Sequence, residues 1–301
     1  MTHKILILGK NGQVGWELIR TMASLGDITA LGREDLDLIN IKLLKQTIRA
    51  NKPDIVINAV ANTAVDLAES QPELPRMINA VVPGEIAKVA KELGAVFIHY
   101  STDFVFDGSH NRPYKETDKV NPINVYGKTK LDGEYAIQEA GGSYLILRTS
   151  MVLSTHKNGY LTKIIHDARN EKYLEFAIDQ VCSPTWARFL AEVTSQIIAQ
   201  PGQNSYEWLS KKSGVYHAAG SGSANKLELA EEIISNDPFP ELHVYKKLIG
   251  MQSKDIITPA IRPSYSALNC DKFFDAFNIR IPDWKIGIAL AMGTINLVRQ
   301  Q

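Results

Sequence analysis

A tyrosine and a lysine four residues apart form the first pair in this sequence whose types suggest chemistry. Tyr126 and Lys130 lie near the start of a helical pattern, so their side chains are expected on one helix face. A tyrosine hydroxyl has an ordinary pKa near ~10, and an adjacent ammonium stabilises the phenolate, which eases proton exchange with a carbonyl or an alcohol. Because the same spacing arises by chance on amphipathic helices, the pair alone would indicate no more than a surface pair.

A run of polar side chains strengthens this interpretation. Tyr100, Ser101, Thr102 and Asp103 stand at the carboxyl end of an apolar run, the edge at which open α/β sheets bind ligands. A hydroxyl there could bond the reacting oxygen while Tyr126 exchanges the proton. The alternative is that Ser101 and Thr102 only end the strand and begin a turn.

A glycine-rich loop follows the first apolar run of the chain. Its glycines, Gly9, Gly12 and Gly15, are spaced GxxGxxG between a predicted strand and a predicted helix. They permit a sharp turn, a close approach of the backbone to a pyrophosphate and tight packing of helix on strand, while the helix N-terminus offers N–H groups to phosphates. Glycines at such turns often serve the turn alone, but the position in the chain favours dinucleotide binding.

The end of the second predicted strand bears on the choice of cofactor. An acidic residue there commonly binds the ribose 2′-hydroxyl of NAD, whereas this chain has Gly32 followed by Arg33. A guanidinium suits a 2′-phosphate, which favours NADPH and leaves NADH possible. A solvated loop arginine is the other interpretation, and Glu34 and Asp35 complicate the local charge.

The order of predicted elements indicates a Rossmann-like α/β fold. Continuous apolar runs alternate with helical patterns, which is typical of βαβ units and a doubly wound parallel sheet. The predicted strands are residues 5–8, 28–31, 55–59, 96–100 and 144–147, and the predicted helices are 14–25, 41–49, 77–93 and 123–140.

Beyond residue 150 the pattern becomes less regular, with predicted strands at 174–178 and 215–218 and predicted helices at 187–199 and 227–235. We therefore expect an NAD(P)-binding domain at 1–150 and a smaller, less regular α/β nucleotide-sugar domain at 151–301. Segments near 174–182 and 214–236 are expected to be able to return to the first domain.

Composition excludes several classes of function. The 33 basic and 33 acidic side chains balance, which argues against a charge-driven nucleic-acid or membrane-surface protein. The apolar start of the chain is too short for a signal peptide, and no run is long enough for a transmembrane helix. Cys182 and Cys270 lack metal-ligand spacing, so the expected location is the cytoplasm and no metal site is expected.

Several longer segments share a resemblance. The chain resembles the extended short-chain dehydrogenase/reductases and, within them, the dTDP-4-dehydrorhamnose reductase family. The segments that carry the resemblance are GKNGQVGWEL (9–18), NAVANTAVDLAE (58–69), HYSTDFVFDG (99–108), NVYGKTKLDGE (124–134), DQVCSPT (179–185) and RPSYSALN (262–269).

This resemblance implies reduction of a dTDP-sugar at its C4 keto group, as the last step of dTDP-rhamnose biosynthesis. It implies a catalytic triad of Thr102, Tyr126 and Lys130, with Tyr126 donating the proton as hydride arrives from NADPH. Substrate contacts are implied for Thr102, Asp103, Met151 and Arg262. The cofactor site would comprise Gly9, Gly12, Gln13, Val14, Gly15, Arg33, Asp37, Leu38, Ala61, Asn62, Thr63, Tyr100, Tyr126 and Lys130.

Departures from the family pattern leave alternatives open. Met151 stands where relatives commonly have an aromatic residue that packs on the substrate, so the stacking contact is lost and the choice of nucleotide sugar stays open. Some relatives form a dimer around magnesium held by glutamates; Glu17 matches one position, but Arg188 and Thr294 occupy the others, which argues against that site and leaves the oligomeric state open. A non-catalytic regulatory subunit, or a reductase or epimerase of another nucleotide sugar, is the alternative function.

Overall fold

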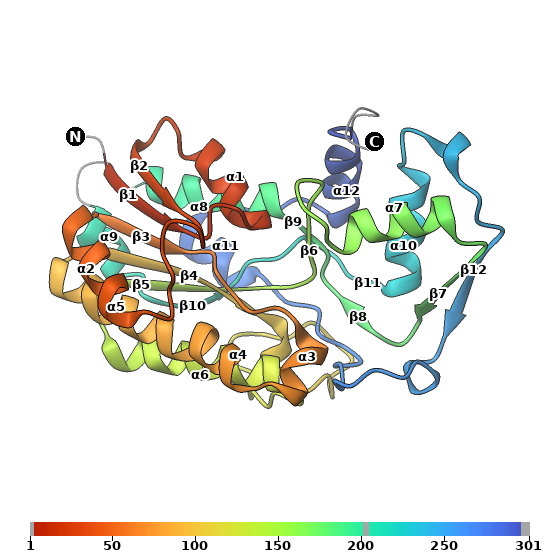
Figure 1. Cartoon of the computed structure of the whole chain (residues 1–301), viewed down its shortest axis with the longest axis horizontal. Helices are drawn as coiled ribbons and strands as arrows, with labels where there is room; N and C mark the ends of the chain where they lie inside the picture. Colours follow the sequence, from red (N-terminus) through yellow and green to blue (C-terminus); the bar gives the residue numbers. More distant parts are fainter. Residues whose placement is uncertain (1–2, 201–204, 296–301) are drawn as a thin grey trace.

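The centre of the molecule is a six-stranded sheet in which every neighbouring pair is parallel (Figure 1). This computed structural model describes residues 3–200 and 205–295. The spatial order is β10-β5-β4-β3-β1-β2. The winding reverses between β1 and β3, where doubly wound sheets form a ligand crevice. The strands are β1 (His3–Leu8), β2 (Gly26–Leu31), β3 (Ile55–Asn58), β4 (Val96–Thr102), β5 (Tyr144–Thr149) and β10 (Gly214–His217).

Helices cover both faces of this sheet, which explains why β3 and β4 are buried along their whole length. One face packs on α1 (Gln13–Thr21), α8 (Ala187–Ala199), α9 (Ser205–Ser210) and α11 (Asp271–Phe277). The other face packs on α2 (Ile41–Asn51), α5 (Val82–Leu93) and α6 (Val125–Ala140). The short helices α3 (Val65–Ser70) and α4 (Glu73–Arg76) follow β3.

A second lobe, on the right in Figure 1, has a core of its own. Three helices enclose this core, namely α7 (Tyr160–Asn170), α10 (Lys226–Ser235) and α12 (Trp284–Met292). Three two-stranded sheets border it: β7 (Tyr173–Ala177) with β12 (Lys247–Met251), β8 (Val181–Cys182) with β11 (Ala224–Asn225), and β6 (Val152–Leu153) with β9 (Thr185–Trp186). None of the described helices has both the length and the apolar character needed to cross a bilayer.

The doubly wound α/β fold predicted from the sequence is confirmed, with two differences at helix starts. The helix expected from residue 77 opens as a π-helical turn, Met77–Val81, before α5. Pro83, in the first turn of α5, lacks an N–H and crowds the carbonyl four residues before it, which disfavours a continuous α-helix there. The helix expected from residue 123 begins at Val125, because the Asn124 side chain accepts the Gly127 N–H and caps it.

The chain passes between the two lobes more than once. β10, within the expected return segment 214–236, joins the large sheet beside β5. The other expected return, 174–182, does not join it, because β7 pairs with β12 and has the alternating exposure of a strand with one solvated face. The domain boundary at residue 150 stays a prediction, and residues 201–204 and 296–301 of the expected second domain lie outside the described residues.

The packing of α1 on the glycine loop generates a stability prediction. A Cβ at Gly15 would lie 2.0 Å from the Gly9 carbonyl oxygen. Gly15→Ala should therefore lower the free energy of unfolding by roughly 1–3 kcal/mol, measured by urea denaturation. Gly293→Ala is the control, because its Cβ would come no closer than 3.5 Å to another heavy atom. Equal losses in the two variants would contradict this close packing.

Candidate active site

The loop between β1 and α1 forms a cradle of bare backbone at the sheet edge. Gly9 has a φ of +97°, and its N–H donates to the Leu31 carbonyl oxygen over 2.8 Å. Gly12 precedes α1 and donates to the Gly9 carbonyl oxygen over 2.9 Å. At the start of α1, the buried Gln13 Oε1 has no hydrogen-bond partner among the described residues. The first turn of α1 offers free N–H groups, and Gly9 and Gly12 have no side chains that would keep a ligand away from the backbone. Both features fit a pyrophosphate.

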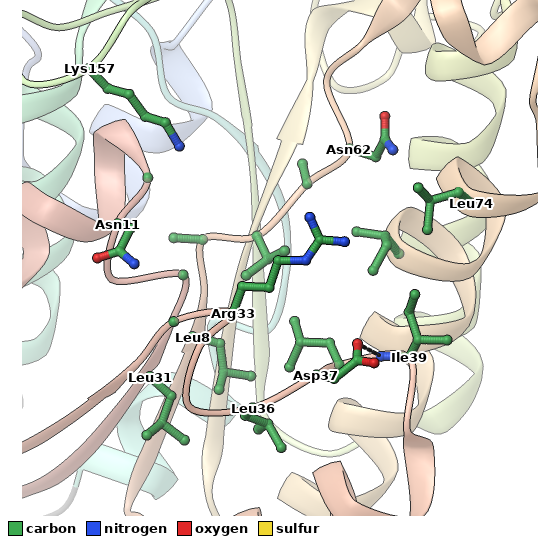
Figure 2. Close-up of a pocket in the computed structure, with 18 residues that line it drawn as sticks. Leu8, Asn11, Leu31, Arg33, Leu36, Asp37, Ile39, Asn62, Leu74 and Lys157 are labelled. Atoms are coloured by element: carbon green, nitrogen blue, oxygen red, sulfur yellow. Dashed lines mark hydrogen bonds between the residues drawn. The ribbon is translucent and has the colours of Figure 1, made fainter.

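A pocket of about 400 Å³ adjoins this cradle (Figure 2). Four other residues expected at the cofactor lie close to this pocket. Gln13 and Val14 form the first turn of α1, and Gly15 packs against the Gly9 carbonyl. Thr63 follows Asn62 and is exposed. Neither Tyr126 nor Lys130 lines the pocket. Residues that do line it include seven of those predicted at the cofactor: Gly9, Gly12, Arg33, Asp37, Leu38, Ala61 and Asn62.

Hydrogen bonds connect this pocket to the helix that carries the tyrosine and lysine. The Asn62 N–H donates to Asn79 Oδ1 over 2.8 Å, and Asn79 Nδ2 donates to Thr129 Oγ1 over 3.1 Å. Asn79 is fully buried, and Thr129 directly precedes Lys130. These hydrogen bonds hold Asn62, at the pocket, in a fixed position relative to α6.

Ion pairs organise the loop after β2 around the pocket. Lys10 Nζ lies 3.1 Å from a Glu34 oxygen and 2.6 Å from an Asp35 oxygen, and Asn11 Nδ2 donates to both Glu34 oxygens over 2.9 Å. These contacts occupy the two carboxylates that complicated the sequence-based assignment. Arg33 extends across the pocket instead (Figure 2). Its guanidinium is thereby presented to a ligand.

Tyr126 is placed by a close contact between α6 and the segment after β4. A Cβ at Gly127 would lie 2.1 Å from the Phe104 carbonyl oxygen, so only glycine lets the helix start so close. The Tyr126 ring meets the Phe104 ring edge to face, with 5.8 Å between the ring centroids. Burial raises the pKa of Tyr126 to about 12, although a hydrogen bond with Thr102 opposes the shift. Tyr126 therefore holds its proton at neutral pH, as an acid must before it donates.

Thr102 and Asp103 lie together at the end of β4. Asp103 is 3% exposed, and its carboxylate accepts hydrogen bonds from Ser150 Oγ at 2.7 Å, Ser266 Oγ at 2.5 Å and Thr102 Oγ1 at 3.1 Å. Burial raises the pKa of Asp103, and the serine hydroxyls oppose the rise. The carboxylate thus joins the end of β4 to the end of β5 through Ser150 and to the later segment that contains Ser266, and it orients the Thr102 hydroxyl beside Tyr126.

Lys130 lies one helical turn beyond Tyr126 and is 1% exposed. Its Nζ donates to the Tyr100 carbonyl oxygen over 2.7 Å and lies 3.1 Å from His99 Nε2. Burial lowers the pKa of Lys130 to about 8, against the influence of Glu134. The structure thus brings Thr102, Tyr126 and Lys130 to one edge of the sheet, with an acid and an amine that burial tunes in opposite senses.

Three other predicted site residues occupy positions that the sequence did not indicate. The Tyr100 ring packs in the core, where its hydroxyl bonds Thr194 Oγ1 over 2.8 Å, so Tyr100 offers the site its backbone carbonyl rather than its ring. Arg262 forms a two-pronged ion pair with Asp66, at 2.7 and 3.1 Å. Met151 adopts a φ of +39°, which is uncommon for a side chain other than glycine.

Sequence reasoning missed several polar residues around the site. Lys157, from the second lobe, lines the pocket on the side where α1 begins (Figure 2). His99, in the middle of β4, contacts Lys130, which no spacing in the sequence indicated. Glu134 forms a buried ion pair with Arg148 at 2.7 Å. The spacing of Glu134, four residues after Lys130, could have revealed it, whereas no local pattern marked Lys157.

Glu17, Arg188 and Thr294, which stand at the positions of the magnesium ligands of some relatives, form contacts with other side chains. Arg188 Nη1 lies 3.3 Å from a Glu17 oxygen, and Arg188 Nε lies 2.8 Å from a Glu192 oxygen. Thr294 shares a 2.9 Å hydrogen bond with Thr155. Within residues 3–200 and 205–295, no group of three or more His, Cys, Asp or Glu side chains could hold a metal ion. The Glu17 carboxylate is therefore in contact with the Arg188 guanidinium.

Comparison with known proteins identifies the family. The model of the RmlD substrate binding domain family matches residues 3–296, which span both lobes. The chain belongs to the RmlD substrate binding domain family. The dTDP-4-dehydrorhamnose reductase of Burkholderia thailandensis is 36% identical over 96% of this chain and 98% of its own length, and that of Escherichia coli is 39% identical over 94% and 95%.

A solved structure extends the RmlD family comparison to three dimensions. The crystal structure of dTDP-4-dehydrorhamnose reductase from Bacillus anthracis in complex with NADP has a TM-score of 0.89 to this chain, with 27% identity, and covers 98% of this chain and 100% of its own. The family resemblance predicted from the sequence motifs is confirmed. Because the family model matches residues 3–296, the match includes the glycine loop, the end of β4 and α6 together.

The burial of Lys130 in this RmlD-family fold predicts a pH-dependent stability. A folded pKa of about 8 lies below the unfolded value near ~10.4, so between these values the unfolded state holds more protons and stability rises with pH. From pH 7 to pH 9, the unfolding free energy of the wild-type protein should rise by about 1 kcal/mol more than that of Lys130→Met. Lys128→Met, exposed on the same helix, is the control and should follow the wild type.

Proposed function

We propose that this protein reduces the C4 keto group of dTDP-4-dehydro-β-L-rhamnose to give dTDP-β-L-rhamnose, with NADPH as the reductant, in the last step of dTDP-rhamnose biosynthesis. One observation carries the proposal: Thr102, Tyr126 and Lys130 lie on the sheet edge that also holds the glycine loop. Relatives matched over nearly the whole chain bear the name of this reductase, which supports the choice of substrate. The first 150 residues would bind the cofactor and residues 151–301 the sugar nucleotide.

The cofactor would extend along the sheet edge from the pocket to α6. The cradle of Gly9, Gly12 and the first turn of α1 would hold the pyrophosphate, and Arg33 would bind the 2′-phosphate. The adenine would lie near Asp37 and Leu38, which line the pocket, and the remaining contacts would come from Ala61, Asn62 and Thr63. Bound NADPH supplies the hydride for C4.

The residues of α6 and β4 would supply the proton and hold the carbonyl group. Tyr126, protonated at neutral pH, is placed to donate to the C4 oxygen as hydride reaches the carbon. Thr102 can donate to the same oxygen once its single hydroxyl hydrogen turns from Asp103 to the substrate, because this hydroxyl lies beside that of Tyr126. Lys130 would contact the nicotinamide ribose and stabilise the phenolate that Tyr126 becomes.

The sugar nucleotide would occupy the space between the end of β4 and the second lobe. Asp103 connects the end of β4 to Ser150, directly after β5, and to Ser266, so it would shape the sugar site while its carboxylate remains hydrogen-bonded. Met151 would cover a sugar face with an apolar side chain in place of an aromatic ring. Arg262 would bind the diphosphate once it exchanges its contact with Asp66. We further propose a cytoplasmic location, in agreement with two free cysteines.

The decisive experiment measures the loss of NADPH absorbance when dTDP-4-dehydro-L-rhamnose is generated in place by the preceding enzymes of its synthesis. We expect turnover by the purified protein. Folded protein that binds NADPH without turnover would support a non-catalytic regulatory subunit instead.

Tyr126→Phe supplies the control for that assay, because it removes only the hydroxyl that donates the proton. We expect turnover to fall at least about a hundredfold, the scale of general acid catalysis, with little change in NADPH affinity. Turnover near that of the wild-type protein would remove Tyr126 from the proposed role.

Two cations of the pocket should differ in what they recognise. Arg33→Ala should weaken binding of NADPH more than that of NADH, because only NADPH carries the 2′-phosphate. Lys157→Ala should weaken both cofactors to a similar degree, because Lys157 lies where α1 begins and the pyrophosphate is common to both. Fluorescence titration with each cofactor measures the four affinities. An equal effect of Arg33→Ala on both cofactors would contradict its assignment.

A further inference from the structure

His99 is a buried polar residue that the mechanism above does not use. It lies in the middle of β4 and has no exposed surface. Its Nδ1 lies 3.1 Å from Asn58 Nδ2 on β3, and its Nε2 lies 3.1 Å from Lys130 Nζ on α6. The imidazole therefore connects an amide in the sheet to the amine of the active site.

The orientation of the Asn58 amide decides the direction of the first of these bonds. The backbone N–H of Val60 lies 3.1 Å from Asn58 Oδ1, and a backbone N–H can only donate. Asn58 Oδ1 therefore faces Val60, and Nδ2, which also only donates, faces His99. His99 Nδ1 must accept, so a neutral imidazole at this position carries its proton on Nε2.

The proton on Nε2 points at Lys130. An ammonium has no lone pair and cannot accept this hydrogen bond, whereas a neutral amine can accept it and still donate to the Tyr100 carbonyl oxygen. We infer that His99, oriented by Asn58, is a positioning residue that stabilises the neutral amine of Lys130 over its ammonium. The inference deepens the proposed function, on which its catalytic meaning rests.

Charged groups around Lys130 do not remove this preference. Glu134, one turn further along α6, favours the ammonium, but its carboxylate already binds Arg148 from β5 and accepts from Ser101 Oγ over 2.5 Å. The Arg148 guanidinium therefore lies directly against this carboxylate, at 2.7 Å.

The titratable groups at the end of β4 and on α6 are likewise occupied. Asp103 accepts three hydroxyl hydrogen bonds, and Tyr126 keeps its proton at neutral pH. Burial holds the pKa of His99 well below its usual range, so His99 stays neutral and acts through its tautomer. The lowering of the pKa of Lys130 to about 8 agrees with a stabilised amine.

This preference would matter after proton donation. When the O–H bond of Tyr126 breaks and its proton joins the C4 oxygen, hydride from NADPH completes the two-electron reduction and a phenolate remains. An Nζ–H bond of the Lys130 ammonium can then break while the Tyr126 O–H bond forms again. The amine left behind accepts the His99 Nε2–H bond until a solvent proton restores the ammonium. His99 would thus assist the return of the proton to Tyr126.

The tautomer of His99 is directly measurable in the unaltered protein. Long-range ¹H–¹⁵N correlation spectra of ¹⁵N-labelled protein distinguish Nε2–H from Nδ1–H, and His99→Gln assigns the signals by their loss. At about pH 9, we expect the Nε2–H tautomer. An Nδ1–H tautomer would overturn the inference, because Nε2 would then offer a lone pair to the ammonium.

Substitution of Asn58 tests the effect on Lys130. Asn58→Leu frees His99 to carry its proton on Nδ1, so the pKa of Lys130 should rise by about one unit, a tenfold change in its ionisation constant. The readout is the Cε shift of ¹³C-labelled lysine, assigned by Lys130→Arg. Asn79→Leu is the matched control, because this buried amide bonds Thr129 rather than His99, and it should leave the titration unchanged. Equal shifts in the two variants, or no shift in Asn58→Leu, would overturn the inference.

Neither measurement needs substrate, so each separates this inference from the proposed function. A protein with the Nε2–H tautomer but no turnover would contradict the reductase function and leave the interaction between His99 and Lys130 intact. Turnover in a protein with the Nδ1–H tautomer would support the reductase function and contradict the inferred role of His99. If Asn58→Leu does not fold, the tautomer of the unaltered protein still decides the question.

Discussion

The whole site depends on helices that approach neighbouring backbone so closely that no side chain fits between them. Gly15 brings α1 onto the Gly9 carbonyl, and Gly127 brings α6 onto the Phe104 carbonyl. Gly133 repeats the contact six residues later, where a Cβ would lie 2.1 Å from the Asn79 carbonyl oxygen. Since α6 carries Tyr126 and Lys130, these contacts decide how deeply both side chains enter the sheet edge. Catalytic geometry here follows from the absence of Cβ atoms.

Burial shifts the pKa values of Tyr126 and Lys130 in opposite directions. The same removal of water that makes Tyr126 hold its proton makes Lys130 release one more easily, because the charged form is anionic in one case and cationic in the other. A chain with no net charge can bind two anionic nucleotides because the cations that would contact them are few and placed: Arg33 and Lys157 at the pocket, Arg262 in the second lobe.

Local patterns predicted most of the fold and the first layer of the site. The apolar strands, the glycine loop and the spacing of Tyr126 and Lys130 each lie within one short segment, and the structure places them as that reasoning requires. The contacts of His99 could not be predicted, since Asn58 and Lys130 lie 41 and 31 residues away in sequence and meet it only through the order of the strands. The direction of the Tyr100 ring and the φ of Met151 likewise depend on packing between distant segments.

The place of β10 has a consequence for how the protein can be made. The strand that completes the large sheet is synthesised after α7 of the second lobe, and α8, which covers α1, also comes after the first 150 residues. During translation, β5 must wait with an unpaired edge and one face of the sheet uncovered. The first 150 residues alone would therefore leave this face of the sheet exposed, and the core on this face closes only after α8, β10 and α11 have been synthesised.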